Sequence, residues 1–193
     1  MKKPLVAILA GGKSSRFGRD KARIEIQGKP LLEHLLQRID AANFPSLVIG
    51  REPQQHDSWE GIPDRQPDAG PAEGLASALA YAASLGYAEL ILLAVDMPCI
   101  DAPFLDWLSG LPASEAVIPV LADRDQYCAA RFATQALATI DKNLRRSKRS
   151  LHEQVASLRS QRYKIPPELT HACSSFNTPS ELIELFDKGL LHD

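Results

Sequence analysis

The feature that most constrains the fold is a regular alternation of short apolar runs with segments of helical periodicity. Apolar runs bounded by glycine or polar residues are typical of buried parallel strands, and apolar residues spaced three and four apart are typical of helices that cover a sheet. Strands are predicted at residues 4–10, 46–50, 89–95, 115–121 and 128–132, and helices at 30–39, 73–86 and 133–146. This order predicts right-handed crossovers and a Rossmann-like three-layer α/β/α sandwich with a mostly parallel central sheet.

Three segments lie outside this alternation. Residues 51–71 are polar and contain prolines, so a long loop is expected there, and long loops are often functional. The tract "RRSKRS" at 145–150 fits either the solvated end of a helix or a phosphate contact. After it, an amphipathic helix is predicted near the end of the sequence, with Thr178 or Ser180 as its cap.

Composition limits the classes of protein that the chain can belong to. With 193 residues, 45% of them hydrophobic, residues 1–193 are expected to form a single domain. The net charge of −2 gives no overall attraction to nucleic acid or to a membrane, so any affinity for phosphate has to be local. The apolar stretch near the start is too short for a signal peptide or a spanning helix, which predicts a cytoplasmic protein. The cysteines form no C-x-x-C pair, so neither a zinc site nor a disulfide framework is expected.

The turn after the first predicted strand reads "LAGGKSSRFGRDKA" and fits neither of two well-defined phosphate loops. A Walker A loop requires four residues between its glycine and Gly-Lys-Ser/Thr, whereas five separate Gly12 from Gly18 here, and Arg19 follows. A dinucleotide-binding G-x-G-x-x-G motif fails because Gly11 and Gly12 are adjacent. Adjacent glycines nevertheless let the backbone approach a flat or anionic ligand and leave N–H groups free to bind it.

Positive charge is concentrated in the same turn. Four cationic residues lie within nine positions: Lys13, Arg16, Arg19 and Lys21. A glycine turn followed by a solvated charge run would have the same composition. The position favours a ligand site, because ligands of open α/β sheets bind outside the carboxyl ends of the strands.

A lone carboxylate, Asp96, ends the most apolar of the predicted strands. It directly follows the run "LILLAV", where it can hold Mg²⁺ together with phosphate oxygens of a substrate. The alternative is that it caps the turn at Met97 and Pro98 by accepting a backbone N–H. Its place beside the cationic glycine turn favours the metal.

These motifs together resemble the molybdenum cofactor guanylyltransferases, within the nucleotidyltransferases of the nucleotide-diphospho-sugar type. "LAGGKSSRFGRDKA", "GKPLLEHLL", "GPAEGLASAL", "AVDMP" and "FNTPSEL" follow one another in the order and spacing of that family, across nearly the whole chain. The resemblance implies transfer of GMP from Mg-GTP to the terminal phosphate of molybdopterin, with release of pyrophosphate and formation of the guanine dinucleotide. "LAGG" rather than "LAAG" favours guanine over cytosine. GTP, molybdopterin or molybdenum cofactor, and molybdoenzyme maturation proteins are the implied partners.

The resemblance also implies roles for individual residues. Lys21, assisted by Arg16, would bind the phosphates of GTP, and Asp96 matches the magnesium ligand. Asp64 matches an acidic position that contacts the nucleotide, and Asn177 matches the asparagine of an N-T-P segment near the acceptor or the metal. The main chain of the opening turn would contact the guanine and the ribose or phosphate through Leu9, Ala10, Gly11 and Gly12. Because the attacking phosphate is already anionic, the reaction needs charge neutralisation and in-line positioning rather than a dedicated base.

The chain departs from the family pattern in two places. Glu73 stands in "GPAEG" where the family has a small residue, and Gln126, Tyr127 and Cys128 stand where it has a His-Pro-Leu-like segment. Two alternatives therefore stay open: a related nucleotidyltransferase that uses CTP or another acceptor, and a nucleotide-binding module without turnover. The presence of Arg16, Lys21 and Asp96 argues against the second.

Overall fold

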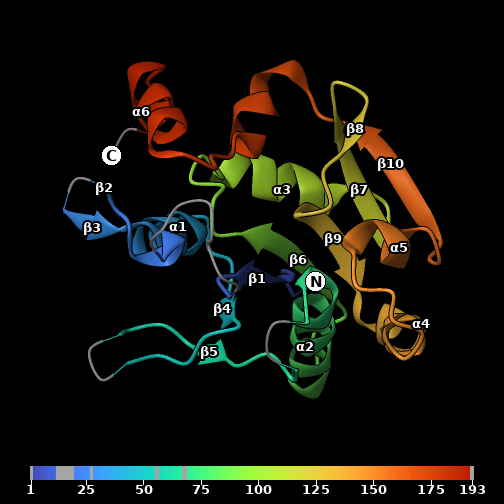
Figure 1. The fold of residues 1–193 in the computed structure, drawn as a ribbon. Helices are drawn as coiled ribbons and strands as arrows, with labels where there is room; N and C mark the ends of the chain where they lie inside the picture. Colours follow the sequence, from blue (N-terminus) through green and yellow to red (C-terminus); the bar gives the residue numbers. More distant parts are fainter. Residues whose placement is uncertain (1, 12–19, 27, 55–56, 67–68, 192–193) are drawn as a thin grey trace.

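The computed structural model describes residues 2–11, 20–26, 28–54, 57–66 and 69–191. In this part of the chain an eight-stranded sheet has the strand order β10-β7-β9-β6-β1-β4-β5, with β8 paired to β7, and β2 and β3 form a separate two-stranded sheet (Figure 1). The strands are β1 (Leu5–Leu9), β2 (Glu25–Ile26), β3 (Lys29–Pro30), β4 (Ser46–Ile49), β5 (Gly61–Ile62), β6 (Glu89–Ala94), β7 (Ala116–Leu121), β8 (Arg124–Asp125), β9 (Ala129–Ala133) and β10 (Ser160–Lys164).

The predicted mostly parallel sheet is confirmed, and one central strand runs against the others. β1 pairs in parallel with β4 and β6, β4 with β5, and β7 with β10. β9 lies between β6 and β7 and is antiparallel to both. Consequently β9 begins at the edge of the sheet where β6 ends, with Ala129 opposite Leu93.

Helices cover both faces of the sheet, which confirms the three-layer architecture. One cluster of buried apolar residues joins the sheet to α1, α3 and α6, and a second joins it to α2, α4 and α5 (Figure 1). Side chains of β1 alternate between the two, with Val6 and Ile8 in the first and Leu5 and Ala7 in the second. The helices are α1 (Leu31–Ala41), α2 (Pro71–Ser84), α3 (Ala102–Gly110), α4 (Leu137–Leu144), α5 (Leu151–Val155) and α6 (Pro179–Asp187), with 3₁₀ turns η1 (Lys21–Arg23), η2 (Thr134–Ala136) and η3 (Pro167–Cys173).

Several boundaries differ from the predicted ones. α2 begins two residues earlier than predicted, at Pro71, because proline fits the first helical position. Pro30 precedes α1 as its N-cap instead of lying in its first turn. The predicted helix at 133–146 is a 3₁₀ turn followed by the shorter α4, and the predicted loop at 51–71 contains β5. Thr178 is the N-cap of α6, as one of the two predicted candidates.

The two outer strands of the sheet are polar or short. β10 carries mostly exposed side chains, and its Arg162 pairs with Asp125 of β8 at 3.0–3.1 Å. β5, at the opposite end of the sheet order, has only two residues. Among the described residues no helix is long and apolar enough to cross a membrane.

Three parallel strands end together at one edge of the sheet. Leu9, the last residue of β1, is paired with Ile49 of β4 and with Ala94 of β6. The segments that follow these strands therefore emerge side by side, and they include Gly11, Arg51 and Asp96. This edge is where ligands bind in open α/β sheets.

Candidate functional site

Lys21, Asp96 and Asn177 meet at this carboxyl edge, although they come from distant parts of the sequence. The Lys21 ammonium donates to Asp96 Oδ2 at 2.8 Å, to the Phe176 carbonyl at 3.0 Å and to Asn177 Oδ1 at 3.2 Å. The side chains of Lys21 and Asp96 are 13% and 25% exposed, so the ion pair lies at the boundary between protein and solvent. The structure thus brings together three of the predicted site residues.

The backbone holds each of these residues by local hydrogen bonds. Lys21 begins the 3₁₀ turn η1, whose N-cap Asp20 accepts from the Ala22 N–H at 3.1 Å. Asn177 precedes the N-cap of α6, and its own N–H is donated to Glu181 Oε2 at 2.6 Å. The Phe176 N–H is donated to the Asp96 carbonyl at 3.3 Å, which ties the segment between η3 and α6 to the turn after β6.

Asp96 does not act as the cap of its own turn. The Met97 N–H is donated to the Ala94 carbonyl at 3.2 Å, and Pro98 has no N–H to offer. Within the described part of the chain, the hydrogen bond of the Asp96 carboxylate is to Lys21. The carboxylate is therefore directed toward a cation, as a ligand for a cationic group would be.

Asp64 lies among three glycines that allow the backbone of β1 and β4 to approach it. A Cβ added at Gly11 would lie 3.3 Å from Asp64 Oδ2 and 3.1 Å from Gly50 Cα, and one added at Gly50 would lie 2.8 Å from Gly11 Cα. Gly50 also has φ +83°, which disfavours other residues. On the other side, a Cβ at Gly74 would lie 3.4 Å from Asp64 Oδ1. The close approach of these segments requires glycine and places a carboxylate at its centre.

The surroundings of Asp64 disfavour the charged form of its carboxylate. Burial, and after it the negative charge of Glu73, raises the pKa of Asp64 above its ordinary value. Its Oδ1 is buried, and no donor for it is found among the described residues. A buried acceptor without a partner is costly in a folded protein, and a donor on a bound ligand would remove that cost.

Arg51 joins the two ends of the opening turn, and the sequence analysis did not identify it. Its guanidinium donates to both carboxylate oxygens of Asp20 at 2.7 Å and to the Ala10 carbonyl at 3.1 Å. A backbone hydrogen bond also ties the end of β1 to the segment after β6, because the Leu9 carbonyl accepts from the Val95 N–H at 3.1 Å. The signal that could have identified Arg51 is its position, because it directly follows the strand "SLVIG", as the opening turn follows the first strand.

A basic cleft of about 460 Å³ lies where α2 begins. Glu73, whose side chain is 4% exposed, accepts from Arg65 Nε at 3.0 Å and lies 3.7 Å from Arg149 Nη1. Arg65 also donates to Asp141 Oδ1 at 2.8 Å. Glu73, which departs from the family pattern, is thus neutralised by arginines, one of them from the "RRSKRS" tract. The cleft is lined by Arg65, Gln66, Glu73, Asp141, Leu144, Arg145, Ser147 and Arg149.

The other departure from the family pattern also lies at the carboxyl edge. Cys128 directly precedes β9, whose first residue is opposite Leu93 near the end of β6. Burial, and to a smaller extent the charge of Asp96, raises the pKa of Cys128 to about 11. The thiol is therefore neutral near pH 7 and packs against both apolar clusters as a small apolar group.

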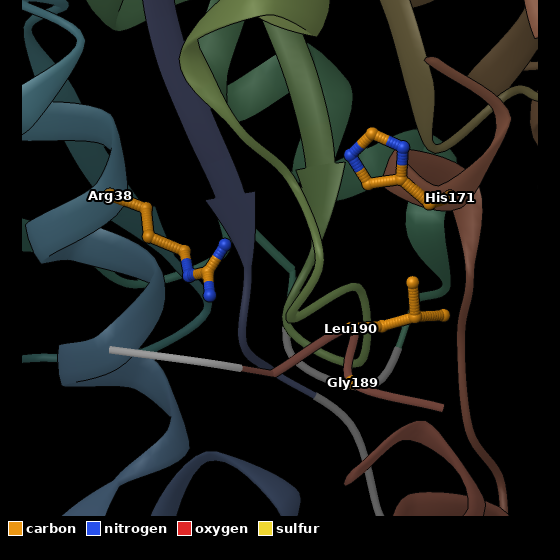
Figure 2. Close-up of a pocket in the computed structure, with 4 residues that line it drawn as sticks. All are labelled: Arg38, His171, Gly189 and Leu190. Carbon is orange, nitrogen blue, oxygen red and sulfur yellow. The ribbon is translucent and has the colours of Figure 1, made fainter. Parts of the chain in front are cut away.

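A second cavity, of about 400 Å³, is lined by none of the predicted site residues. Figure 2 shows Arg38 of α1 and His171 of η3 on opposite sides of it, with Gly189 and Leu190 lower in the view. His171 Nε2 lies 2.8 Å from Asp101 Oδ2, and Asp101 caps α3. Because Asp101 is the N-cap of α3, its contact with His171 joins η3 to α3.

The middle of the opening turn lies outside the residues that the structure describes. Gly12 and Arg16, with the cationic Lys13 and Arg19, fall in 12–19, outside the described residues. Leu9 ends β1, and Ala10 and Gly11 follow it at the carboxyl edge of the sheet.

The oxygen groups around Lys21 have the chemistry of a divalent metal site. Asp96 Oδ2, Asn177 Oδ1 and the Phe176 carbonyl converge on the Lys21 ammonium. Carboxylate, amide and carbonyl oxygens suit Mg²⁺. Within the described residues no group of three or more His, Cys, Asp or Glu side chains could hold a metal. The donor set fits a metal held by one carboxylate and completed by substrate phosphates.

The chain is similar to known proteins in both sequence and fold. The sequence model of the MobA-like NTP transferase domain matches residues 6–161. A protein of Opitutus terrae named "Probable molybdenum cofactor guanylyltransferase" is 35% identical over 183 residues, covering 91% of each chain. One of the same name from Deinococcus radiodurans is 31% identical over 188 residues, covering 95% of this chain and 94% of its own. The crystal structure of molybdopterin-guanine dinucleotide biosynthesis protein A from Archaeoglobus fulgidus has the same fold, with a TM-score of 0.79 and 23% identity over 95% of this chain and 99% of that one.

Proposed function

The chain belongs to the family of MobA-like NTP transferase domains, and from this premise we propose that it transfers GMP from GTP to the terminal phosphate of molybdopterin. The products are pyrophosphate and the guanine dinucleotide form of the cofactor. The proposal includes Mg²⁺ as the metal and delivery of the product to molybdoenzyme maturation proteins in the cytoplasm.

The observation that carries this proposal is the meeting of Lys21, Asp96 and Asn177 beside a glycine turn. A carboxylate and an amide from two distant segments lie within 3.2 Å of the Lys21 ammonium, at the edge of the sheet where ligands of open α/β sheets bind. The arrangement suits a triphosphate, because it offers one positive charge for phosphate oxygens and a hard oxygen ligand for the metal that accompanies them.

The residues of the site have complementary tasks in this reaction. Lys21 binds phosphate oxygens of GTP and neutralises negative charge as pyrophosphate leaves. Asp96 and Asn177 would hold Mg²⁺, which when bound supplies charge stabilisation to the phosphates of the transition state. The acceptor phosphate is already anionic, so its attack on the α-phosphorus requires alignment and shielding from repulsion rather than removal of a proton. In this scheme Arg16 assists Lys21.

Selection of the base is assigned to Asp64 and the glycines around it. The guanine edge carries N–H donors, and the buried Asp64 Oδ1 is an acceptor without a described partner. The backbones at Gly11 and Gly50 lie so close to each other and to Asp64 that a side chain at either position would clash. Glu73 places a second carboxylate nearby, but its pairing with Arg65 makes it unavailable to the base.

The test is an assay of purified protein with each of the four nucleoside triphosphates, Mg²⁺ and molybdopterin, in which pyrophosphate release is followed. GTP should support release at least tenfold faster than the other three, and only when molybdopterin is present. Release with CTP instead would favour the related cytidylyltransferase. Binding of GTP without release from any acceptor would favour the nucleotide-binding module.

A further inference from the structure

The three hydrogen-bond donors of the Lys21 ammonium are matched by three oxygens. Its partners are Asp96 Oδ2 at 2.8 Å, the Phe176 carbonyl at 3.0 Å and Asn177 Oδ1 at 3.2 Å. An ammonium has three N–H groups and no acceptor, so this arrangement leaves it no donor for a phosphate. Yet Lys21 is the residue that the proposed function requires to contact the phosphates of GTP.

The same three oxygens are the groups proposed to meet the metal. An ammonium and a divalent cation that both approached Asp96 Oδ2 within contact distance would repel each other strongly, because they carry like charges at a short separation. Whichever cation is present therefore excludes the other from this position. Lys21 and the metal compete for one oxygen-lined position.

The backbone around Lys21 is held by hydrogen bonds and by burial of Ala22, so the exchange requires movement of the lysine side chain alone. Asp20 caps η1, Arg51 holds Asp20 through two hydrogen bonds of 2.7 Å, and Ala22 is 2% exposed. The lysine stem has four flexible carbons, so its ammonium can turn from one partner to another without moving the chain.

We infer that Lys21 fills the metal position of the nucleotide-free protein and leaves it only when a nucleoside triphosphate offers phosphate oxygens to its ammonium. The metal then enters with the nucleotide, since Asp96 and Asn177 are released in the same step. This inference rests on the proposed function and adds an order of events to it. It makes the affinities for metal and triphosphate depend on each other, since two ligands that favour the same arrangement bind cooperatively.

The test measures binding of Mn²⁺, as a paramagnetic probe, to protein without nucleotide, by electron paramagnetic resonance of the free ion. The Lys21→Gln variant removes the charge and keeps most of the length of the side chain. We expect it to bind Mn²⁺ at least about tenfold more tightly than the unchanged protein, because the competing ammonium is absent. The Asp96→Asn change in the same variant should abolish this gain.

Lys3→Gln is the matched control. Lys3 also donates to a carbonyl, that of Ala42 at 2.8 Å, and to a carboxylate, that of Asp106 at 3.1 Å. It precedes β1 and so lies at the opposite edge of the sheet. This variant lowers the total charge by the same amount and should leave the affinity for Mn²⁺ unchanged.

Equal or weaker Mn²⁺ binding by Lys21→Gln would overturn the inference, as would an equal gain in Lys3→Gln. If Lys21→Gln does not fold, Lys21→Met serves in its place. Should both fail to fold, the unchanged protein gives the answer through NMR of its lysine ammonium groups. The Lys21 signal should shift when GTP is added without metal, and an unmoved signal would contradict the exchange.

The two experiments distinguish a failure of this inference from a failure of the proposed function. Mn²⁺ binding to the nucleotide-free protein needs neither GTP nor an acceptor. An unchanged protein that transfers GMP while Lys21→Gln shows no gain in Mn²⁺ affinity would contradict the exchange alone. A gain in affinity without transfer to any acceptor would support the exchange and contradict the proposed reaction.

Discussion

Asp96 and Lys21 act at the site mainly through charge, since their side chains form an ion pair that remains in contact with solvent. The cost of removing two largely buried charges from water offsets much of their attraction, so such an ion pair adds little net stability to a fold. Substitutions that keep the shape and remove the charge should therefore separate function from folding at both positions.

Asp96→Asn should lower turnover at least ~100-fold, equivalent to roughly 3 kcal/mol, because it removes one preorganised electrostatic group from the transition state. Binding of GTP should fall much less, and the protein should remain folded because the amide is nearly isosteric. Rates measured against Mg²⁺ concentration test this. A variant with normal activity and an unchanged Mg²⁺ midpoint would show that Asp96 is not a metal ligand.

Lys21→Ala should weaken binding of GTP and of GDP by roughly ten- to a hundredfold, the range expected for one charge-assisted hydrogen bond. Guanosine, which has no phosphate, should bind almost as before. Titration calorimetry with the three ligands makes the comparison. An equal loss for guanosine and GTP would indicate a disturbed fold rather than a lost phosphate contact.

Asp64→Asn should have opposite effects on stability and on binding. Burial and Glu73 raise the pKa of Asp64, so the folded state favours its neutral form and is destabilised as pH rises through that pKa. Asparagine is neutral throughout, so the variant should be more stable than the unchanged protein at pH 7, and this gain should shrink at pH 4. GTP affinity should fall. Urea unfolding at both pH values checks the sign, and a loss of stability at pH 7 would mean that the fold stabilises the carboxylate.

At the scale of elements, the two ends of the opening turn are joined by a residue that follows another strand. Arg51, just after β4, bridges the Ala10 carbonyl at the end of β1 and Asp20 at the start of η1. The guanidinium fork makes this contact with two atoms of one carboxylate, which a lysine cannot reproduce.

Arg51→Lys should therefore lower GTP affinity about tenfold, because the ends of the turn and Lys21 are no longer held in register. Turnover with saturating GTP should fall less. Arg23→Lys is the control, since Arg23 lies 3.6 Å from the same Asp20 and makes a weaker contact. Calorimetric titration with GTP compares the two variants, and equal affinities would show that Arg51 has no part in positioning.

Strands that are buried on both faces and helices with one apolar stripe could be predicted from the sequence. Exposed or very short elements could not. β1, β4, β6, β7 and β9 are buried apolar runs, and each was predicted within about two residues. β10 reads "SQRYK", because it lies at the edge of the sheet and its side chains meet solvent. α5 has five residues, too few for a periodic pattern, although Ser150 and Glu153 form a capping box.

A site residue could be predicted where its position at the end of a strand indicated its role. Asp96 was expected at the carboxyl edge because it ends an apolar strand, and its contact with Lys21 agrees with that expectation. The role of Phe176 could not be predicted, because it acts through a backbone carbonyl that any residue possesses. The basic cleft was missed because it joins Arg65 to Arg149 and Glu73, and pairing between distant charges leaves no pattern in the sequence.

At the scale of the whole molecule, the two apolar clusters share one sheet, so neither is expected to unfold alone. We expect residues 1–193 to unfold as a single unit. Trp59 and Trp107 both pack against the cluster of α1, α3 and α6, whereas circular dichroism also reports on α2 and α4. Urea transitions followed by tryptophan fluorescence and by circular dichroism should therefore coincide. Separate midpoints would show two independently stable units.

The polar β10 and the two-residue β5 also affect how copies of the molecule behave toward one another. An exposed strand at the edge of a sheet offers unpaired backbone groups to which another chain can add. Here one edge displays charged side chains, Arg162 and Lys164, and the other is too short to serve as a template. The buried apolar strands, which would aggregate readily if exposed, are thereby kept from other chains, and the folded protein should tolerate high concentration without forming fibrils.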